Sequence, residues 1–317
     1  MQANPLIVGA DVAKAELVVG CPGHSEVRHI ANRAQEIDAW LSELPAGSIV
    51  AMESTGVYHR LLAARAHTAG MRVYVLNARD VHFYAKAMGT RGKTDRVDAG
   101  VIARYVAEHH ARLRPWRPAE PAHGRLEELV RRRGVLVTKR DAIRQTLRGC
   151  ADLAPSLALM ERAFDDLLGT LDAKVQGLID ADAALLTGQQ RVASVIGFGP
   201  QGSSMLAVLL ARLDFASADA LVAYSGLDPR PNDSGNKRGK RRITKRGPAY
   251  LRRQVYMAGF SASHSKALKG LYQAMRAKGF ATTEAFMILG RKLLRAAYSV
   301  WKTGQPFDPS KLMPKTA

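Results

Sequence analysis

The chain has 317 residues, of which 47% are hydrophobic and 24% charged, and its formal net charge at pH 7 is +19. This length predicts about two globular domains, and because no apolar run reaches roughly 18 residues, we expect no membrane-spanning helix. The first residues lack the pattern of a secretory signal, and the two cysteines, Cys21 and Cys150, are too few for a disulfide framework or a metal cluster. We therefore expect an intracellular, cytoplasmic protein.

The positive charge is concentrated in the last part of the chain. Residues 191–317 contain 22 Lys and Arg but only 6 Asp and Glu, whereas the two kinds nearly balance before residue 191. A basic protein without membrane signals favours a polyanionic partner, and nucleic acid is the commonest one. A charge that serves only solubility is the alternative.

The first part of the chain predicts a mixed α/β domain. Apolar alternation over residues 6–21 indicates two strands joined by a turn at Ala13 and Lys14. Further strands are expected at residues 25–32, 47–55 and 71–78, and helices at residues 33–44, 56–70 and 94–110, the last with Thr94 as its N-cap. The resulting order, β-β-β-α-β-α-β-α, is typical of a mixed sheet with helices rather than a purely parallel sheet.

A long helical region follows a linker at residues 111–118. Its apolar positions recur every seven residues, at Leu129, Leu136, Ile143 and Cys150. A second helical pattern begins after Pro155, so two long antiparallel helices would fit, and so would the coiled-coil arm of a dimer. We assign residues 119–190 to this coiled-coil-like region.

The C-terminal domain, residues 191–317, is predicted to be mostly helical. Gly197 and Gly199 form a turn before a helix, which resembles a helix-hairpin-helix that grips phosphate and equally fits an ordinary glycine turn. Ser203 and Ser204 follow, where they could cap the helix or contact a phosphate. Further helices are expected at residues 247–264, 266–279 and 282–304.

Four carboxylates of the first domain are candidate metal ligands. Asp11 interrupts an apolar strand and Glu53 ends another, while Asp95 and Asp98 share a face at the start of a helix. A charge within a buried strand is costly unless it is paired or binds a metal. Carboxylate oxygens suit Mg²⁺ or Mn²⁺, and two such ions about 4 Å apart can polarise a phosphodiester. A strand-end salt bridge and an interaction with the helix dipole are the structural alternatives for Glu53 and for the helix pair.

The order of elements matches the ribonuclease H fold. Its first strand carries a central Asp, its fourth strand ends in an acid, and a late helix supplies the last ligands. Its sheet order, 3-2-1-4-5, puts the first and fourth strands side by side, so we expect Asp11 and Glu53 to be neighbours. We assign residues 1–112 to a domain of this kind.

The basic segment, residues 232–247, reads NDSGNKRGKRRITKRG. Its glycines allow the backbone to approach a sugar-phosphate chain closely, and its cations neutralise phosphates, which predicts salt-dependent binding. We expect two arginines of the following helix, Arg252 and Arg253, to face the same strand. The seven cations of the segment are Lys237, Arg238, Lys240, Arg241, Arg242, Lys245 and Arg246. An electrostatic loop with an ordinary turn serine, Ser234, is the alternative.

Four stretches of the chain resemble the insertion sequence 110 family of transposases. They are GADVAKAEL (9–17), AMESTGVYH (51–59), GKTDRVDAGVIARY (92–105) and AYSGLDPRPNDSGNKRGKRRITKRGPAYLRR (223–253). The resemblance implies an N-terminal DEDD domain of the ribonuclease H type, similar to Holliday-junction resolvases, and a C-terminal transposase domain. Asp11, Glu53, Asp95 and Asp98 fall on the family's four acids, and Ser234 falls on its nucleophilic serine.

The resemblance also implies a mechanism and partners. In the family the serine attacks DNA and forms a phosphoserine intermediate, the acids hold Mg²⁺, and both domains join in one composite site. A structured bridge RNA selects donor and target DNA, and the protein assembles as a dimer or tetramer. Such a protein acts at the bacterial nucleoid. Ser225, in AYSGLDP, is instead expected to be a packing residue beside Tyr224.

Two other functions remain open from the sequence. A junction-resolving nuclease would use only the acids and water, and would need no serine. A nucleic-acid-binding protein with an inactive ribonuclease H fold would need neither the acids nor the serine.

Overall fold

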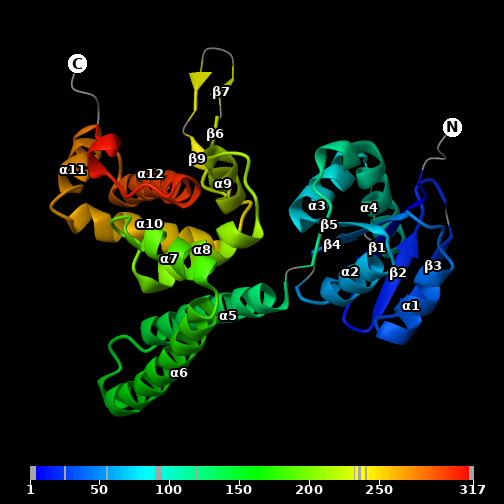
Figure 1. Ribbon diagram of the computed structural model, residues 1–317, viewed down its shortest axis with the longest axis horizontal. Helices are drawn as coiled ribbons and strands as arrows, with labels where there is room; N and C mark the ends of the chain where they lie inside the picture. The colour runs from blue at the N-terminus through cyan, green and yellow to red at the C-terminus, as the bar shows by residue number, and fades with distance from the viewer. Residues whose placement is uncertain are drawn as a thin grey trace. The chain divides into compact units, whose positions relative to one another are not determined.

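The structure is a computed structural model that describes residues 5–24, 26–54, 56–89, 95–118, 120–231, 233–234, 237–239 and 241–313, with the backbone alone for residues 95–97, 233–234 and 237–238. It divides into two compact units, residues 1–118 and residues 119–317 (Figure 1).

The N-terminal unit is built on a five-stranded sheet of order β3-β2-β1-β4-β5. Its strands are β1 (Ile7–Val12), β2 (Glu16–Gly20), β3 (Val27–Ala31), β4 (Ile49–Glu53) and β5 (Arg72–Leu76). β1 is antiparallel to β2 and parallel to β4, so the sheet is mixed. Both the mixed sheet and the strand order expected for a ribonuclease H fold are confirmed.

Two pairs of helices cover the two faces of this sheet (Figure 1). Helices α1 (Ala34–Ser42) and α2 (His59–Thr68) pack with Val8, Ala10 and Met52 on one face. Helices α3 (Ala78–Ala87) and α4 (Asp95–His109) cover the other face, which carries Ile49 and Ala51, and a short 3₁₀ turn (His110–Arg112) follows α4.

Helix α3 was missing from the sequence prediction, although its start carries a recognisable signal. The Asn77 side chain accepts a hydrogen bond from the Arg79 amide at 2.9 Å and so caps the helix. The Tyr84 hydroxyl of α3 donates to Glu108 of α4 at 2.7 Å, and burial, followed by the effect of this carboxylate, raises the pKa of Tyr84 to about 12. The predicted N-cap of α4, Thr94, lies outside the described residues.

Helix α4 lies in direct contact with the central strand β1. A Cβ added to Gly9 would lie 2.1 Å from the Ala99 carbonyl oxygen and 2.6 Å from the Ala103 amide nitrogen. No side chain fits between these backbones, so glycine at this position sets the distance between helix and sheet.

The C-terminal unit begins with an antiparallel hairpin of two long helices, α5 (Pro121–Thr146) and α6 (Ala154–Asp180), separated by a 3₁₀ turn (Ala151–Leu153). Leu126 and Leu129 of α5 share a buried cluster with Val175 and Ile179 of α6. Towards the tip the hairpin is joined by ion pairs, such as Arg144 with Glu161 at 2.5 Å. The predicted pair of antiparallel helices is therefore present, but Cys150 is exposed beyond the end of α5 and does not extend the apolar seam.

A helical bundle forms the rest of this unit. It contains α7 (Ala183–Ala193), α8 (Pro200–Arg212), α9 (Ala218–Ser225), α10 (Ala249–His264), α11 (Lys269–Ala277) and α12 (Thr282–Thr303), and a 3₁₀ turn (Pro309–Leu312) follows. Helices α10 and α12 cross closely, since a Cβ at Gly259 would lie 2.1 Å from the Phe286 carbonyl and one at Gly290 would lie 2.3 Å from that of Val255. None of the helices in the described ranges is long and apolar enough to cross a membrane.

The Gly9 contact predicts opposite effects for two glycine substitutions. Gly9→Ala should lower the free energy of unfolding of the N-terminal unit by about 1–3 kcal/mol, because its methyl group overpacks the interface with α4. Gly100→Ala, on α4 where an added Cβ meets nothing within 4 Å, should be neutral or raise stability by up to about 1 kcal/mol. Chemical denaturation of both variants measures the difference, and equal stabilities would contradict the close packing.

Candidate functional site

Asp11 and Glu53 lie on adjacent central strands of the sheet. β1 and β4 run parallel with Gly9 opposite Ala51 and Ala10 opposite Met52. The same register, continued by one residue, brings Asp11 alongside Glu53, the last residue of β4. Both side chains are partly buried. The expectation that these two acids are neighbours in the sheet agrees with this register.

Both acids belong to the sheet face that α4 covers. Side chains alternate between faces along a strand, so Asp11 shares a face with Gly9, and Glu53 shares one with Ala51. Gly9 contacts α4, and Ala51 lies in the same buried cluster as Ile102 of α4. On each of these two strands, the carboxylate therefore comes two residues after a position on which α4 packs.

Helix α4 starts at Asp95 and carries Asp98 in its first turn. Asp98 is partly buried and lies four residues before Ile102, which is 1% exposed, so both lie on the face of α4 that meets the sheet. For Asp95 the description covers the backbone alone. The first turn of α4 thus adds carboxylate positions to the side of the sheet on which Asp11 and Glu53 lie.

The chemistry of these residues suits a hard divalent cation. Carboxylate oxygens are the ligands that Mg²⁺ and Mn²⁺ prefer, and strand-end and helix-borne acids on one side of a sheet can supply several. Among the side chains that the structure describes, no group of three His, Cys, Asp or Glu residues is arranged to hold a metal ion. The Asp95 carboxylate is not one of the described side chains.

Within the described residues, the basic segment and the residues just before it form a ladder of two pairs of short strands. β6 (Pro229–Arg230) pairs with β9 (Arg242–Ile243), and β7 (Asp233–Ser234) pairs with β8 (Lys237–Arg238), Ser234 lying opposite Lys237. Lys240 lies outside the described residues. Four of the predicted nucleic-acid-binding cations are exposed: Arg241, Arg242, Lys245 and Arg246.

The base of this ladder is fixed to helix α9. The amide of Thr244 donates to the Asp228 carbonyl at 3.0 Å, and that of Lys245 donates to the Gly226 carbonyl at 2.9 Å. The Thr244 hydroxyl also donates to the Asp228 carboxylate. A Cβ on Gly247 would lie 1.9 Å from the Tyr224 carbonyl oxygen, so the segment and the end of α9 are in backbone contact. The strand that carries Ser234 therefore extends from a fixed base.

Arg252 completes this base from the first turns of α10. Its guanidinium donates to the Gly247 carbonyl and, at 3.4 Å, to that of Ser225, while burial lowers its pKa. Arg253 donates to Asp141 of α5 at 2.5 Å. Both arginines were predicted to face nucleic acid, and that role stays a prediction, but each guanidinium already has a partner within the protein. The bonding role of Arg252 was not recognised in the sequence, although the glycines at 226 and 247 were a signal of close backbone contact.

Contacts within the protein account for the other serines and for the glycine turn that the sequence singled out. Ser225 is fully buried and donates to the Val222 carbonyl at 2.6 Å, as expected for a packing residue. Ser203 and Ser204 are buried and donate to the Pro200 carbonyl, so the alternative of a phosphate contact is wrong for them. A Cβ on Gly197 would lie 2.3 Å from the Ala258 carbonyl, which favours the ordinary turn, packed on α10, over a phosphate-binding one.

Comparisons with known proteins identify the family. Residues 8–154 match the DEDD IS110 model, described as a transposase, and residues 189–273 match the transposase model of the IS116/IS110/IS902 family. The pilin gene-inverting protein of Moraxella lacunata is 30% identical over 264 residues, which cover 81% of each chain. The chain belongs to the IS110 family of transposases.

Other relatives agree with this assignment. The uncharacterized 42 kDa protein of insertion element IS900 from Mycobacterium paratuberculosis is 25% identical and aligns over 97% of this chain and 98% of its own. A probable family 20 transposase of Pseudomonas aeruginosa is 28% identical, with 77% and 80% coverage. The predicted resemblance to IS110 transposases is confirmed, and with it a function in cutting and rejoining DNA.

The fixed base of the basic segment can be tested on two arginines that bond to carbonyls. Arg252→Met keeps the apolar stem but removes the donors to Gly247 and Ser225, and should cost about 1–3 kcal/mol of unfolding free energy. Arg276→Met is the matched control, because Arg276 donates to the Phe280 carbonyl at an exposed site. Chemical denaturation, with limited proteolysis of the basic segment, should detect loosening in the first variant alone. If both variants have the same unfolding free energy and the same resistance to proteolysis, Arg252 does not stabilise the base of the basic segment.

Proposed function

We propose that this transposase cuts DNA with Ser234 as nucleophile, while Asp11, Glu53, Asp95 and Asp98 hold Mg²⁺ or Mn²⁺ at the reacting phosphodiester. The observation that carries the metal site is the β1–β4 register, which brings Asp11 and Glu53 together on the side of the sheet covered by α4. Neighbouring acids at the ends of two adjacent strands are the arrangement with which a ribonuclease H fold binds divalent ions.

In this proposal the Ser234 oxygen attacks phosphorus, so a serine–phosphate bond forms as the bond to one bridging oxygen of the DNA breaks. The serine proton passes to a base or to water, and the departing oxygen is protonated in turn. The four acids would hold divalent ions, which would supply electrostatic stabilisation to the charge that develops on the phosphate. In the second step a DNA hydroxyl attacks the phosphoserine and restores the serine, which rejoins the strands.

The basic segment and the rest of the C-terminal unit bind nucleic acid in this proposal. Exposed cations, among them Arg241, Arg242 and Arg246, neutralise backbone phosphates, and binding should weaken steeply as salt rises. The excess of positive charge in residues 191–317 also suits a guide RNA, which the family resemblance implies as the selector of donor and target DNA. The site of action would be DNA at the nucleoid, in the cytoplasm.

Assembly into a homo-oligomer, a dimer or tetramer, is part of the proposal. The α5–α6 hairpin carries large apolar side chains in contact with water, including Leu159, which is 64% exposed, and Leu167, which is 46% exposed. These two residues are eight positions apart and so lie on one side of α6. An exposed apolar stripe on a long helical hairpin favours contact with another copy.

The serine mechanism predicts a covalent intermediate. Full-length protein, incubated with element DNA, the RNA transcribed beside the gene and Mg²⁺, should form a protein–DNA adduct that denaturing electrophoresis resolves. Ser234→Ala should abolish the adduct and strand exchange without loss of nucleic-acid binding. Ser261→Ala, at an exposed serine of α10, should retain both. If Ser234→Ala still cuts DNA, the water-using nuclease is the correct function instead.

The metal site predicts a loss of activity that does not depend on folding. Asp11→Asn and Glu53→Gln should each reduce strand cleavage at least about 100-fold, because an amide has no charge to hold the cation. Glu36→Gln, at an exposed acid of α1 on the opposite face of the sheet, is the control and should remain active. Calorimetric titration with Mg²⁺ and Mn²⁺ gives an independent readout. Cleavage that persists unchanged in both site variants would contradict the metal site, and absence of cleavage in the unaltered protein would support a non-catalytic binding protein.

A further inference from the structure

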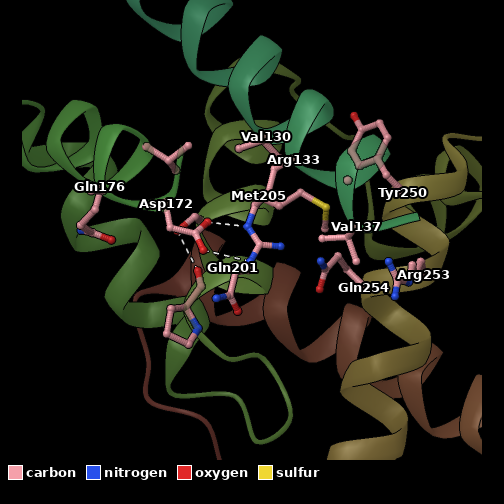
Figure 2. Close-up of a pocket in the computed structure, with 15 residues that line it drawn as sticks. Val130, Arg133, Val137, Asp172, Gln176, Gln201, Met205, Tyr250, Arg253 and Gln254 are labelled. Carbon is pink, nitrogen blue, oxygen red and sulfur yellow. Dashed lines mark hydrogen bonds and ion pairs between the residues drawn. The ribbon is translucent and has the colours of Figure 1, made fainter. Parts of the chain in front are cut away.

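A cavity of about 300 Å³ lies within the C-terminal unit, between α5, α6, α8 and α10 (Figure 2). None of the residues predicted from the sequence to carry catalysis lines it. Helix α10 connects the cavity with the basic segment, because it follows the segment directly in the chain and contributes Tyr250, Arg253 and Gln254 to the lining. A cavity of this size is at the lower end of the range for small-molecule sites.

Part of the cavity wall consists of apolar groups. Val130 and Val137 of α5, Met205 of α8 and the Tyr250 ring contribute them, as Figure 2 shows. Gly134, also in the lining, leaves space for Tyr250, since a Cβ there would lie 3.1 Å from the Tyr250 Cβ. Apolar and aromatic groups of this kind can contact the face of a planar ring.

Some of the polar groups around the cavity already have protein partners. Arg133 forms a bidentate ion pair with Asp172, in which Nη2 lies 2.9 Å from Oδ2 (Figure 2). Gln176 exchanges hydrogen bonds with Gln189 at 2.8 and 3.2 Å. These pairs hold α5 to α6 and α6 to α7, and need no ligand.

The side-chain amides of Gln201 and Gln254 differ from these pairs. Both line the cavity, Gln201 as an exposed residue and Gln254 as a partly buried one, and within the described part of the chain neither side chain has a hydrogen-bond partner in the protein. Figure 2 shows Gln201 below Arg133 and Gln254 beside Arg253, at the α8 and α10 walls. An amide presents a donor and an acceptor side by side, the arrangement that pairs with the edge of a nucleobase.

We propose that this cavity captures one unstacked nucleobase of the nucleic-acid strand bound by the basic segment. The apolar part of the wall contacts the faces of the base, and the Gln201 and Gln254 amides pair with its edge. The proposal rests on the proposed function, because the strand is the one that the basic segment holds. Capturing a base outside the stack would fix the register of that strand relative to Ser234, the role that such pockets have where proteins read single-stranded regions.

An abasic scan tests for the captured base. Full-length protein is titrated, without divalent ions, with single-stranded DNA and RNA oligonucleotides of one sequence in which each nucleotide in turn is replaced by an abasic analogue. Loss of the captured base should weaken binding about 5- to 100-fold at one position, as measured for bases that stack on protein side chains. The comparison of the two series decides whether the base comes from DNA or from RNA.

Two valines of α5 provide a matched pair of variants. Val137→Phe fills the cavity from its wall and should remove the position-specific penalty, so that all abasic oligonucleotides bind equally. Val135→Phe adds the same ring two residues away, at a side chain that is 48% exposed and outside the cavity, and should keep the penalty. Thermal melting of both variants confirms that they are folded. A penalty that persists in Val137→Phe overturns the proposal.

The amide of Gln254 gives a second, independent readout. Gln254→Leu retains the volume of the side chain but not its hydrogen bonds, so discrimination between the four bases at the sensitive position should fall about 5-fold or more. Gln273→Leu, at an exposed glutamine of α11, should not change it. Unaltered discrimination in Gln254→Leu excludes the amide as the reader of the base.

The outcomes separate this inference from the proposed function. If no oligonucleotide shows a position-specific penalty while binding and adduct formation remain intact, the cavity holds no base and the serine mechanism is unaffected. If the protein binds neither DNA nor RNA, the proposed function itself fails.

Discussion

The close approach of α4 to β1 is the constraint on which the N-terminal unit depends. Because residue 9 has no side chain, the helix backbone rests on the central strand, with the Ala99 carbonyl and the Ala103 amide at the position a Cβ would need. The first turn of the same helix carries Asp98, and the same face of the sheet ends in Asp11 and Glu53. The packing that buries the helix therefore also determines where its carboxylates can be.

In the C-terminal unit, α10 connects three features that are separate in the sequence. Its first turns hold the base of the basic segment through Arg252, and Arg253 joins it to α5. Tyr250 and Gln254 form part of the cavity. Further along, Gly259 allows the contact with α12 that stabilises the bundle. One rigid helix thus relates the strand that carries Ser234 to the cavity in which we propose a base is held, and both lie on the same folding unit.

Local patterns predicted much of the fold but not every element. Alternation and turn residues were sufficient for the five strands, and the sheet order was predicted because the order of elements matches that of the ribonuclease H fold. Helix α3 was missed, since its ten residues bury only Val81 and its cap is a single Asn77. The seven-residue spacing predicted the α5–α6 hairpin but extended too far, to Cys150, because periodicity does not mark where a helix ends.

The sequence by itself determined the fold class and the family, and through the family resemblance it supplied the four acids and the serine that we propose as site residues, because each depends on residue types at spacings that can be read along the chain. Only the tertiary structure decided the partners of Arg252 and Arg253, the burial of Ser203, Ser204 and Ser225, and the existence of the cavity between α5, α6, α8 and α10. Each of these features depends on contacts between residues that are distant in the sequence, such as Asp141 and Arg253. Such contacts depend on how helices pack in three dimensions, and residue spacing along one helix carries no information about the surface that it will meet.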